Sequence, residues 1–192
     1  MAPTGTRRGK LIVISAPSGA GKTSIARTIL ARNQGLRFSV SATTRPQRAA
    51  EIEGEDYYFL TKQEFQRRVA AGEFAEWEEI YGELYGTLRS EIDRAATNGE
   101  DLLFDVDVKG GLSIKRLYPK ALLIFIQPPS TEILYERLRN RHTENEATLA
   151  RRMERVPLEL AMGAQFDKQV VNDELERAID EVQSVIQQYI MQ

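Results

Sequence analysis

Short apolar runs alternate along the chain with longer stretches of helical period. Strands are predicted at the runs rich in branched residues, which are Leu11–Ser15, Leu102–Asp105, Leu122–Ile126 and Lys168–Val171. Helices are predicted over Lys22–Ala31 and, after a Ser130 cap, over Glu132–Arg139. Strands that alternate with helices are typical of a parallel sheet covered by helices. The pattern therefore predicts an α/β core.

The stretch after Val171 has the cleanest helical period. Its apolar residues fall three and four apart, at Leu175, Ala178, Ile179, Val182, Val185, Ile186, Tyr189 and Ile190. Such a stripe packs on a sheet or binds a partner helix. Because Asn172 and Asp173 follow a strand directly and are positioned to cap a helix, we expect packing on the sheet.

Between Phe38 and Thr87 the pattern changes to short segments that are predicted as antiparallel strands: Tyr57–Leu60, Phe74–Ile80 and Leu84–Thr87. A Gly82–Glu83 turn joins the last two. Thr61 and Glu64 stand at the spacing of a capping box and mark a short helix between the first two strands. An antiparallel insert in a parallel frame indicates a substrate lobe rather than a second independent domain.

Length and composition narrow the classes of protein. The 192 residues predict one compact domain, at about 150 residues per domain. A net charge of -2 argues against a protein that binds nucleic acid by charge alone. The absence of cysteine excludes disulfides and thiolate metal sites, and the single histidine, His142, makes a Ser-His-Asp triad improbable. No apolar run reaches the roughly 18 residues of a membrane span, so a cytoplasmic protein is expected.

The strongest local signal is a glycine-rich segment between a predicted strand and a predicted helix. It reads Ala16-Pro17-Ser18-Gly19-Ala20-Gly21-Lys22-Thr23 and fits a Walker A phosphate loop except at Ala16, where the pattern has glycine. A small residue fits that corner if its φ is negative. Backbone N–H groups and the helix dipole would hold phosphates, Lys22 would reach the β/γ-phosphates, and the Thr23 hydroxyl would bind Mg²⁺.

Two further segments carry candidate chemistry. The apolar run that precedes Asp105 and Asp107 places two acids beside the phosphate loop, where they can order Mg²⁺ or hold a substrate, or simply cap a helix. The stretch 137–155 is rich in arginine and poor in large apolar residues. It is either a solvated helical hairpin or a lid that brings guanidinium groups onto phosphates.

Several motifs in order resemble the guanylate kinase family. They are Ser15 to Thr23, Ser41-Ala-Thr-Thr-Arg-Pro-Gln-Arg48, Gly54-Glu-Asp-Tyr-Tyr-Phe59, Glu76-Trp77, Tyr85-Gly-Thr87, Asp105-Val-Asp107 and Val171-Asn-Asp173. The chain has no Asn-Lys-x-Asp segment, which argues against a regulatory GTPase. The resemblance covers nearly the whole chain and implies transfer of the γ-phosphoryl group of ATP to GMP with Mg²⁺, and it leaves dGMP open as a second acceptor. It implies no obligatory protein, nucleic-acid or membrane partner.

The same resemblance implies a division of the chain and of its site residues. It implies a P-loop core at about 10–36, 88–136 and 156–192, a GMP-binding lobe of mixed or antiparallel strands at about 37–87, and a small helical lid at about 137–155. ATP would be held by residues 16–23, Arg141 and Asn172, the last of which is equally suited to capping a helix. Residues in the GMP site would be Ser41, Arg45, Arg48, Tyr57, Glu76, Tyr85, Thr87, Asp105 and Asp107.

The implied roles make chemical sense. Arg45 and Arg48 can present two guanidinium groups to the GMP phosphate, completed by the Tyr57 and Tyr85 hydroxyls. The Glu76 carboxylate can accept from guanine N1–H and the exocyclic amine, whereas adenine would leave a buried charge unpaired, which costs about 1–3 kcal/mol or more. A surface position for Glu76 is the alternative. The transferring group would be surrounded by Lys22, Asp107, Arg45 and the lid arginines Arg137, Arg141 and Arg152.

Two residues depart from the family pattern, His142 at a usual glycine and Lys109 at a usual glutamine. They bear on the lid backbone and on the charge beside Asp107. Two other functions remain open at this point. One is a related domain that binds protein and has lost catalysis, against which the retained Lys22 and Thr23 argue. The other is a kinase acting on a phosphorylated ribose, which would need no carboxylate at Glu76.

Overall fold

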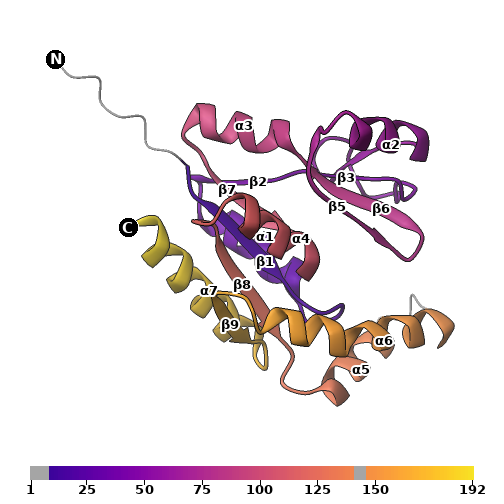
Figure 1. Ribbon diagram of the computed structural model, residues 1–192. Coiled ribbons are helices and arrows are strands. Elements are labelled where there is room, and N and C mark those ends of the chain that lie inside the picture. Colours follow the sequence, from indigo (N-terminus) through magenta and orange to yellow (C-terminus); the bar gives the residue numbers. More distant parts are fainter. Residues whose placement is uncertain (1–8, 141–145) are drawn as a thin grey trace.

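A parallel five-stranded sheet forms the centre of the protein (Figure 1), and the computed structural model describes residues 9–140 and 146–192. The strands are β1 (Leu11–Ser15), β2 (Leu36–Phe38), β7 (Asp101–Asp105), β8 (Leu122–Gln127) and β9 (Lys168–Val171), in the order β2-β7-β1-β8-β9. The four strands predicted for the core are confirmed. The pattern missed β2, because it has three residues and Arg37 interrupts its apolar run.

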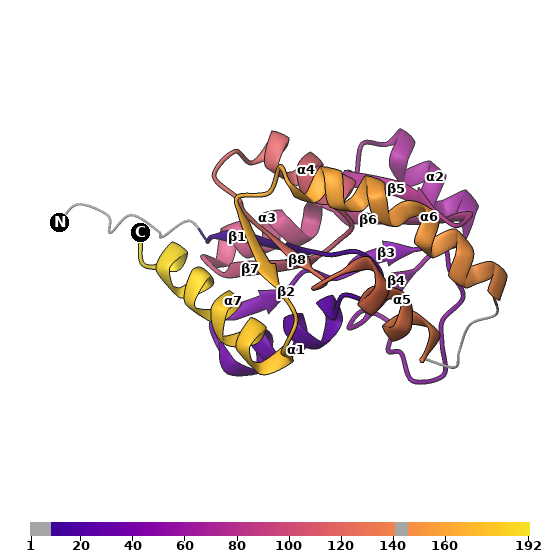
Figure 2. The ribbon, with the colours of Figure 1, turned by 90° about the horizontal axis from the view of Figure 1, so that it is seen from below.

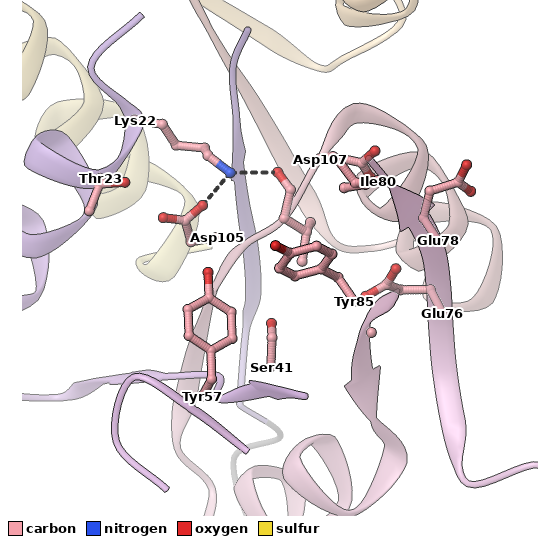
Figure 3. A pocket seen from close by; sticks show the side chains of 12 residues that line it. Lys22, Thr23, Ser41, Tyr57, Glu76, Glu78, Ile80, Tyr85, Asp105 and Asp107 are labelled. Carbon is pink, nitrogen blue, oxygen red and sulfur yellow. Dashed lines mark hydrogen bonds and ion pairs between the residues drawn. The ribbon is translucent and has the colours of Figure 1, made fainter. Parts of the chain in front are cut away.

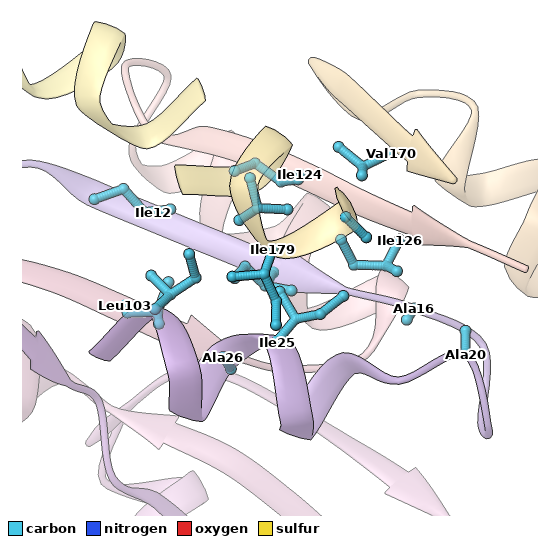
Figure 4. Packing of buried hydrophobic residues seen from close by; sticks show 14 of the residues in the cluster. Ile12, Ala16, Ala20, Ile25, Ala26, Leu103, Ile124, Ile126, Val170 and Ile179 are labelled. Atoms are coloured by element: carbon cyan, nitrogen blue, oxygen red, sulfur yellow. The ribbon is translucent and has the colours of Figure 1, made fainter. Parts of the chain in front are cut away.

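Helices cover both faces of this sheet. On one face α1 (Lys22–Arg32) and α7 (Leu175–Ile190) pack against Ile12 and Ile14 of β1 (Figure 4). On the other face α3 (Arg89–Asn98) and α4 (Val108–Leu117) enclose a second cluster that contains Val13. Side chains alternate across a strand, so the apolar run of β1 supplies both clusters. The predicted α/β core is confirmed.

Helix α7 packs as predicted but begins differently. Ala178, Ile179, Val182 and Ile186 are buried in the cluster that contains Ile12, so the apolar stripe covers the sheet. The predicted cap at Asn172–Asp173 is wrong: the N-cap residue is Glu174, whose side chain makes no capping hydrogen bond. The Asn172 side chain is buried and turned toward the phosphate loop instead.

A second sheet of four strands lies beside the core. It consists of β3 (Ser41–Thr43), β4 (Tyr57–Phe59), β5 (Phe74–Ile80) and β6 (Glu83–Leu88), in the order β4-β3-β6-β5. The β5–β6 and β3–β6 pairs are antiparallel, but β4 runs parallel to β3, so the antiparallel prediction for β4 is wrong. The loop 44–56 carries the chain back along β3, which sets this direction.

The short elements of this second sheet follow their local signals. Helix α2 (Lys62–Ala70) begins as predicted, because the Thr61 hydroxyl accepts a hydrogen bond from the Glu64 N–H at 3.1 Å. The β5–β6 turn lies one residue before the predicted position. Tyr81 (φ 55°) and Gly82 (φ 84°) are both left-handed, as a two-residue type I′ turn requires.

Helix α5 (Thr131–Arg139) lies at the carboxyl end of the central sheet, and α6 (Glu146–Gly163) runs from beside α5 back along the sheet toward the start of β9, as Figure 2 shows. Helix α6 runs unbroken through residue 155, the expected end of the lid. Arg141 and His142 lie outside the described residues. Within the described ranges, no helix is both long enough and apolar enough to cross a bilayer.

Candidate active site

The phosphate loop joins the carboxyl end of β1 to the first turn of α1. Gly19 and Gly21 have φ values of 91° and 95°, which other residues adopt only with strain. Ala16 has no such φ, since Tyr81 is the one described non-glycine residue with positive φ. The alanine at the first Walker A position therefore fits, and helix α1 begins at Lys22 with its free N–H groups facing the loop.

The loop is held from behind by Asn172, which directly follows β9. The Asn172 Nδ2 donates to the Ala20 carbonyl at 2.8 Å, and a Cβ at Gly21 would lie 2.3 Å from the same nitrogen. The packing therefore requires glycine at position 21. Asn172 Oδ1 is buried without a hydrogen bond. Asn172 thus contacts the far side of the phosphate loop and does not cap α7.

Lys22 lies between the phosphate loop and the end of β7 (Figure 3). Its ammonium group is paired with Asp105 and donates to the Val106 carbonyl at 3.1 Å. Burial lowers the lysine pKa, but the attraction of Asp105 outweighs burial, so the pKa lies above its ordinary value. Lys22 is therefore fully charged at neutral pH.

Asp107 follows the same strand and is used on both oxygens. Its Oδ1 accepts from the Gly110 N–H at 2.8 Å, which caps α4, and its Oδ2 lies 3.3 Å from Arg155 Nη2. The expected pair of acids thus stands beside the phosphate loop. The helix-cap interpretation is correct for Asp107, and it coexists with a position in the cleft.

Four site residues form one row across the second sheet. Tyr57 of β4 pairs with Ser41 of β3, Ser41 with Thr87 of β6, and Thr87 with Glu76 of β5. Residues directly opposite one another on neighbouring strands share a face. The register therefore gathers on one face of the sheet four residues that are far apart in the sequence.

Glu76 ends this row as a buried carboxyl group. Its Oε1 accepts from the Thr87 hydroxyl at 2.6 Å, and only 8% of the residue is exposed. Burial raises its pKa to about 7, aided by the nearby charges of Asp107 and Glu78. The surface interpretation of Glu76 is therefore wrong.

Glycine at position 110 makes room for this carboxyl group. A Cβ there would lie 2.8 Å from Glu76 Oε2 and 3.2 Å from Asp107 Oδ1. Real Cβ atoms do not approach so closely, so a side chain at position 110 would displace one of the two acids. Gly110 was not identified from the sequence, because no local pattern distinguishes it from other glycines.

The arginines expected on the GMP phosphate are arranged differently from one another. Arg45 is paired with Glu51, through Nη2–Oε1 at 2.7 Å and Nη1–Oε2 at 3.0 Å. Arg48 is exposed, and its backbone N–H donates to Glu51 at 2.8 Å. Neither side chain lines the cavity between Lys22 and Glu76, whereas the side chains of Tyr57 and Tyr85 do. Sequence reasoning missed Glu51 as the residue that organises this loop.

Lys109 is neutralised across the boundary between core and second sheet. Its Nζ lies 2.5 Å from Glu78 Oε1, two residues beyond Glu76 on the same strand. The departure at position 109 therefore adds no unpaired charge beside Asp107. It forms instead an ion pair that joins α4 to β5.

The arginines of the predicted lid also differ in position. Arg152 of α6 donates to the Ser18 hydroxyl at 2.8 Å and lines the cavity over the phosphate loop. Arg137 is half-buried on α5 and is not part of that lining. Arg141 lies outside the described residues. Arg155 and Glu159, which the sequence did not single out as site residues, line the same cavity as Arg152.

Two adjoining cavities share five lining residues, which are Lys22, Thr23, Ile80, Tyr85 and Asp107. One, of about 220 Å³, extends toward Ser41, Tyr57 and Glu76, and the other, of about 270 Å³, lies over the phosphate loop. Figure 3 shows Lys22 and Asp105 across the first cavity from Glu76 and Glu78. A single cleft thus has a basic, glycine-rich end and an acidic, hydroxyl-rich end, joined at one lysine.

Known proteins are similar to this chain in sequence and in fold. A sequence profile of the guanylate kinase family matches residues 8–189. The guanylate kinase of Chlorobium chlorochromatii is 49% identical over 183 residues, which cover 95% of this chain and 96% of that protein. The guanylate kinase of Symbiobacterium thermophilum is 44% identical over 179 residues, or 93% and 85% of the two chains. The crystal structure of guanylate kinase from Anaplasma phagocytophilum is similar with a TM-score of 0.78 and 29% identity, covering 97% of this chain and 88% of that one.

Proposed function

The chain belongs to the guanylate kinase family and is an ATP:GMP phosphotransferase; we propose that ATP binds over the phosphate loop and GMP binds against the four-stranded sheet. The row of Tyr57, Ser41, Thr87 and Glu76 carries the proposal, because it supplies a buried carboxyl group and hydroxyls to one cavity. The two substrates then meet at Lys22, which borders both cavities.

The donor end of the cleft suits a triphosphate. The N–H groups of residues 19–23 and the start of α1 supply partial positive charge. Lys22 adds a full charge beside the β- and γ-phosphates, and Arg152 lines the same space. Asn172 holds the loop in shape from behind, and we propose that it also borders the adenine side of the ATP site.

The acceptor end suits guanine. The ionised Glu76 accepts from guanine N1–H and the exocyclic amine. The Thr87 hydroxyl donates to one Glu76 oxygen, and Ser41 lies opposite Thr87 on the neighbouring strand. Adenine has no N1–H, so it would leave this buried carboxylate with no hydrogen bond from the base, and the Thr87 hydroxyl would be its one side-chain donor among the described residues. Burying a neutral polar group without a hydrogen-bond partner costs about 1–3 kcal/mol, and burying an unpaired charge costs more. The site therefore discriminates against AMP.

The GMP phosphate is proposed to lie toward Tyr57, Tyr85, Arg45 and Arg48. The Tyr57 and Tyr85 hydroxyls line the cavity, and the ring of Tyr57 stacks under the Arg45 guanidinium at 5.3 Å. Arg45 keeps its Nε–H group outside the pair with Glu51, so it has donors left for a phosphate. Its charge then stabilises the negative oxygens of the acceptor.

The residues at the junction fit magnesium. Thr23 offers a hydroxyl, and Asp107, whose oxygens are already engaged, would act through water. Within the described ranges, no three acidic or histidine side chains gather into a metal site. This suits Mg²⁺, which keeps several waters and takes other ligands from substrate phosphates. When bound, the ion would neutralise charge on the ATP phosphates.

The transfer needs positioning and charge stabilisation rather than covalent help from the protein. The positive charge of Lys22 stabilises the oxygens of the transferring phosphoryl group, and the arginines near the cleft add further positive charge. Residues 137–155 are predicted to form a lid, and its residues Arg137 and Arg141 are predicted to contact the transferring phosphoryl group. We further propose a cytoplasmic location, where both substrates are available.

The deciding experiment measures ADP release with ATP and Mg²⁺ for GMP, dGMP, AMP, CMP and UMP at equal concentration. We expect turnover with guanine nucleotides only. A Glu76→Gln variant should lose selectivity for GMP while it still binds ATP, because the amide presents one oxygen and an N–H donor where guanine needs two acceptors. Equal loss of ATP and GMP binding in this variant would contradict the assignment of the two ends.

A further inference from the structure

One face of helix α6 lines the cleft with charged side chains. Arg152, Arg155 and Glu159 are spaced three and four residues apart, which places them on the same side of a helix. All three border the cavity over the phosphate loop. Arg152 contacts the loop itself, at Ser18. The other two have no role in the proposed handling of ATP.

Arg155 contacts its own helix and two segments outside it. Its Nη2 lies 3.3 Å from Asp107 Oδ2 at the start of α4, and its Nε lies 3.4 Å from Glu159 Oε1 on its own helix. Its guanidinium carbon is 5.4 Å from the ring centre of Tyr81. Tyr81 occupies the left-handed turn between β5 and β6, at the tip of the second sheet. Arg155 therefore joins the phosphate-loop side of the cleft to the proposed GMP side.

The position of Arg155 also balances charge. Asp107 and Glu159 face the same cavity, where two negative charges disfavour the placement of phosphates. Side-chain exposures of 22% for Arg155, 15% for Asp107 and 10% for Glu159 mean that water screens this group only partly. Removing Arg155 would take away the cation that is paired with both acids.

We propose that Arg155 is a positioning residue for phosphoryl transfer: it fixes Asp107 and the Tyr81 turn against α6, and so sets the GMP-binding sheet relative to the phosphate loop. The proposal rests on the proposed division of the cleft. It assigns Arg155 no contact with either substrate. Its effect is on the distance and alignment between the two substrates, to which transfer rates are highly sensitive.

Steady-state kinetics of Arg155→Met test the proposal, because methionine keeps an unbranched stem and removes the charge and the planar group. We expect kcat/KM for GMP to fall about 10- to 100-fold, as a displacement of about 1 Å would cause, with KM for ATP changed less than about threefold. Arg151→Met, an exposed arginine on the same helix, is the matched control and should behave as the unmodified protein. Equal kinetics of the two variants would overturn the proposal.

A second pair of variants separates positioning from simple charge and guards against misfolding. Arg155→Lys keeps the charge but loses the fork and the ring stacking, so it should recover only part of the rate. Tyr81→Leu should slow GMP turnover, and Arg155→Met should cost less in that background than alone. Independent, multiplicative effects would contradict the link to Tyr81. Unfolding temperatures are compared throughout, and the lysine and leucine variants serve if the methionine variant does not fold.

The outcomes also separate this inference from the function on which it rests. If the unmodified protein phosphorylates no acceptor, the proposed division of the cleft fails, and the positioning role that rests on it fails with it; if GMP is turned over and Arg155→Met behaves as Arg151→Met, the positioning role alone fails. If GMP is turned over and Arg155→Met raises KM for ATP as strongly as KM for GMP, Arg155 contacts the donor phosphates directly. That result would replace the positioning role.

Discussion

The Arg45 guanidinium donates two parallel hydrogen bonds, of 2.7 and 3.0 Å, to the two carboxylate oxygens of Glu51. This contact holds the pKa of Glu51 below its ordinary range, and it raises that of Arg45. The loop that is proposed to bind the GMP phosphate is therefore organised before the substrate arrives. Glu51 also accepts from the Arg48 N–H, so one acid orients both ends of the segment.

Glu51→Gln tests whether this orientation matters. The amide accepts only one of the two hydrogen bonds and carries no charge, so Arg45 gains rotamer freedom that GMP binding must then remove. We expect KM for GMP to rise about tenfold, which is about 1.4 kcal/mol, with kcat and KM for ATP nearly unchanged. Glu181→Gln, an exposed change on α7, is the control. A lower KM for GMP would show instead that Glu51 competes with the phosphate.

The pKa of about 7 at Glu76 predicts a pH-dependent affinity for GMP. The carboxylate form accepts from guanine, so GMP affinity should be highest above pH 7 and fall up to tenfold for each unit below it. The second pKa of a nucleotide phosphate lies near 6 and contributes a separate dependence. Calorimetric titration of GMP from pH 5.5 to 8.5 separates the two, because Glu76→Gln retains only the phosphate contribution. Identical pH profiles would contradict the role of Glu76.

The same pKa has an opposite consequence for stability. The folded pKa of Glu76 lies above its ordinary value of 4.5, so the folded state binds the proton more tightly than the unfolded state. The contribution of Glu76 to stability is therefore present below about pH 4.5 and is lost as the pH rises through 7. Glu76→Gln should raise the unfolding temperature at pH 8 relative to the unmodified protein, and much less at pH 4.5. An equal difference at both pH values would argue against a buried, titrating carboxyl group.

Gly110→Ala tests the space beside Glu76. Alanine favours a helix over glycine by about 1 kcal/mol, so the fold should tolerate the change. Its Cβ would lie 2.8 Å from Glu76 Oε2 and would push the carboxyl group from its position. We expect KM for GMP to rise at least about tenfold, a cost of about 1.4 kcal/mol, while KM for ATP stays the same. Gly35→Ala, where a Cβ meets open space, is the matched control.

Lys22→Met tests the charge at the junction of the two cavities. Removing one preorganised donor from a developing negative charge typically costs about 10²–10³ in kcat. We expect a loss of at least that size, with GMP still bound, because Glu76 and its hydroxyl neighbours are untouched. Lys120→Met, an exposed change, is the control in the same assay. Retention of more than a tenth of the activity would exclude the assigned role of Lys22.

Local signals in the sequence determined most of the elements and part of the site. The phosphate loop was predicted because its chemistry is local: two glycines, a lysine and a hydroxyl follow a strand directly and open a helix. The cap of α2 and the buried stripe of α7 were predicted for the same reason. A helix period or a capping spacing is written into adjacent residues, and tertiary contacts reinforce it.

Long-range pairing decided what the sequence left open or suggested wrongly. The direction of β4 depends on the course of the loop 44–56, which no local pattern specifies. Asn172 has a suitable side chain and position for capping α7, yet it contacts Ala20 because the end of β9 lies behind the phosphate loop. The sequence predicted that Arg45 binds a phosphate, but it did not predict the ion pair of Arg45 with Glu51, because that pair depends on the path of the folded loop.

The sequence by itself determined the core strands, the phosphate loop and the types of residue available for GMP. Tertiary structure alone decided that Tyr57, Ser41, Thr87 and Glu76 share one face, that Gly110 leaves room for a buried carboxyl group, and that Arg155 spans the cleft. The physical reason is that secondary structure depends on neighbours along the chain, whereas register, burial and pKa depend on groups brought together from distant positions.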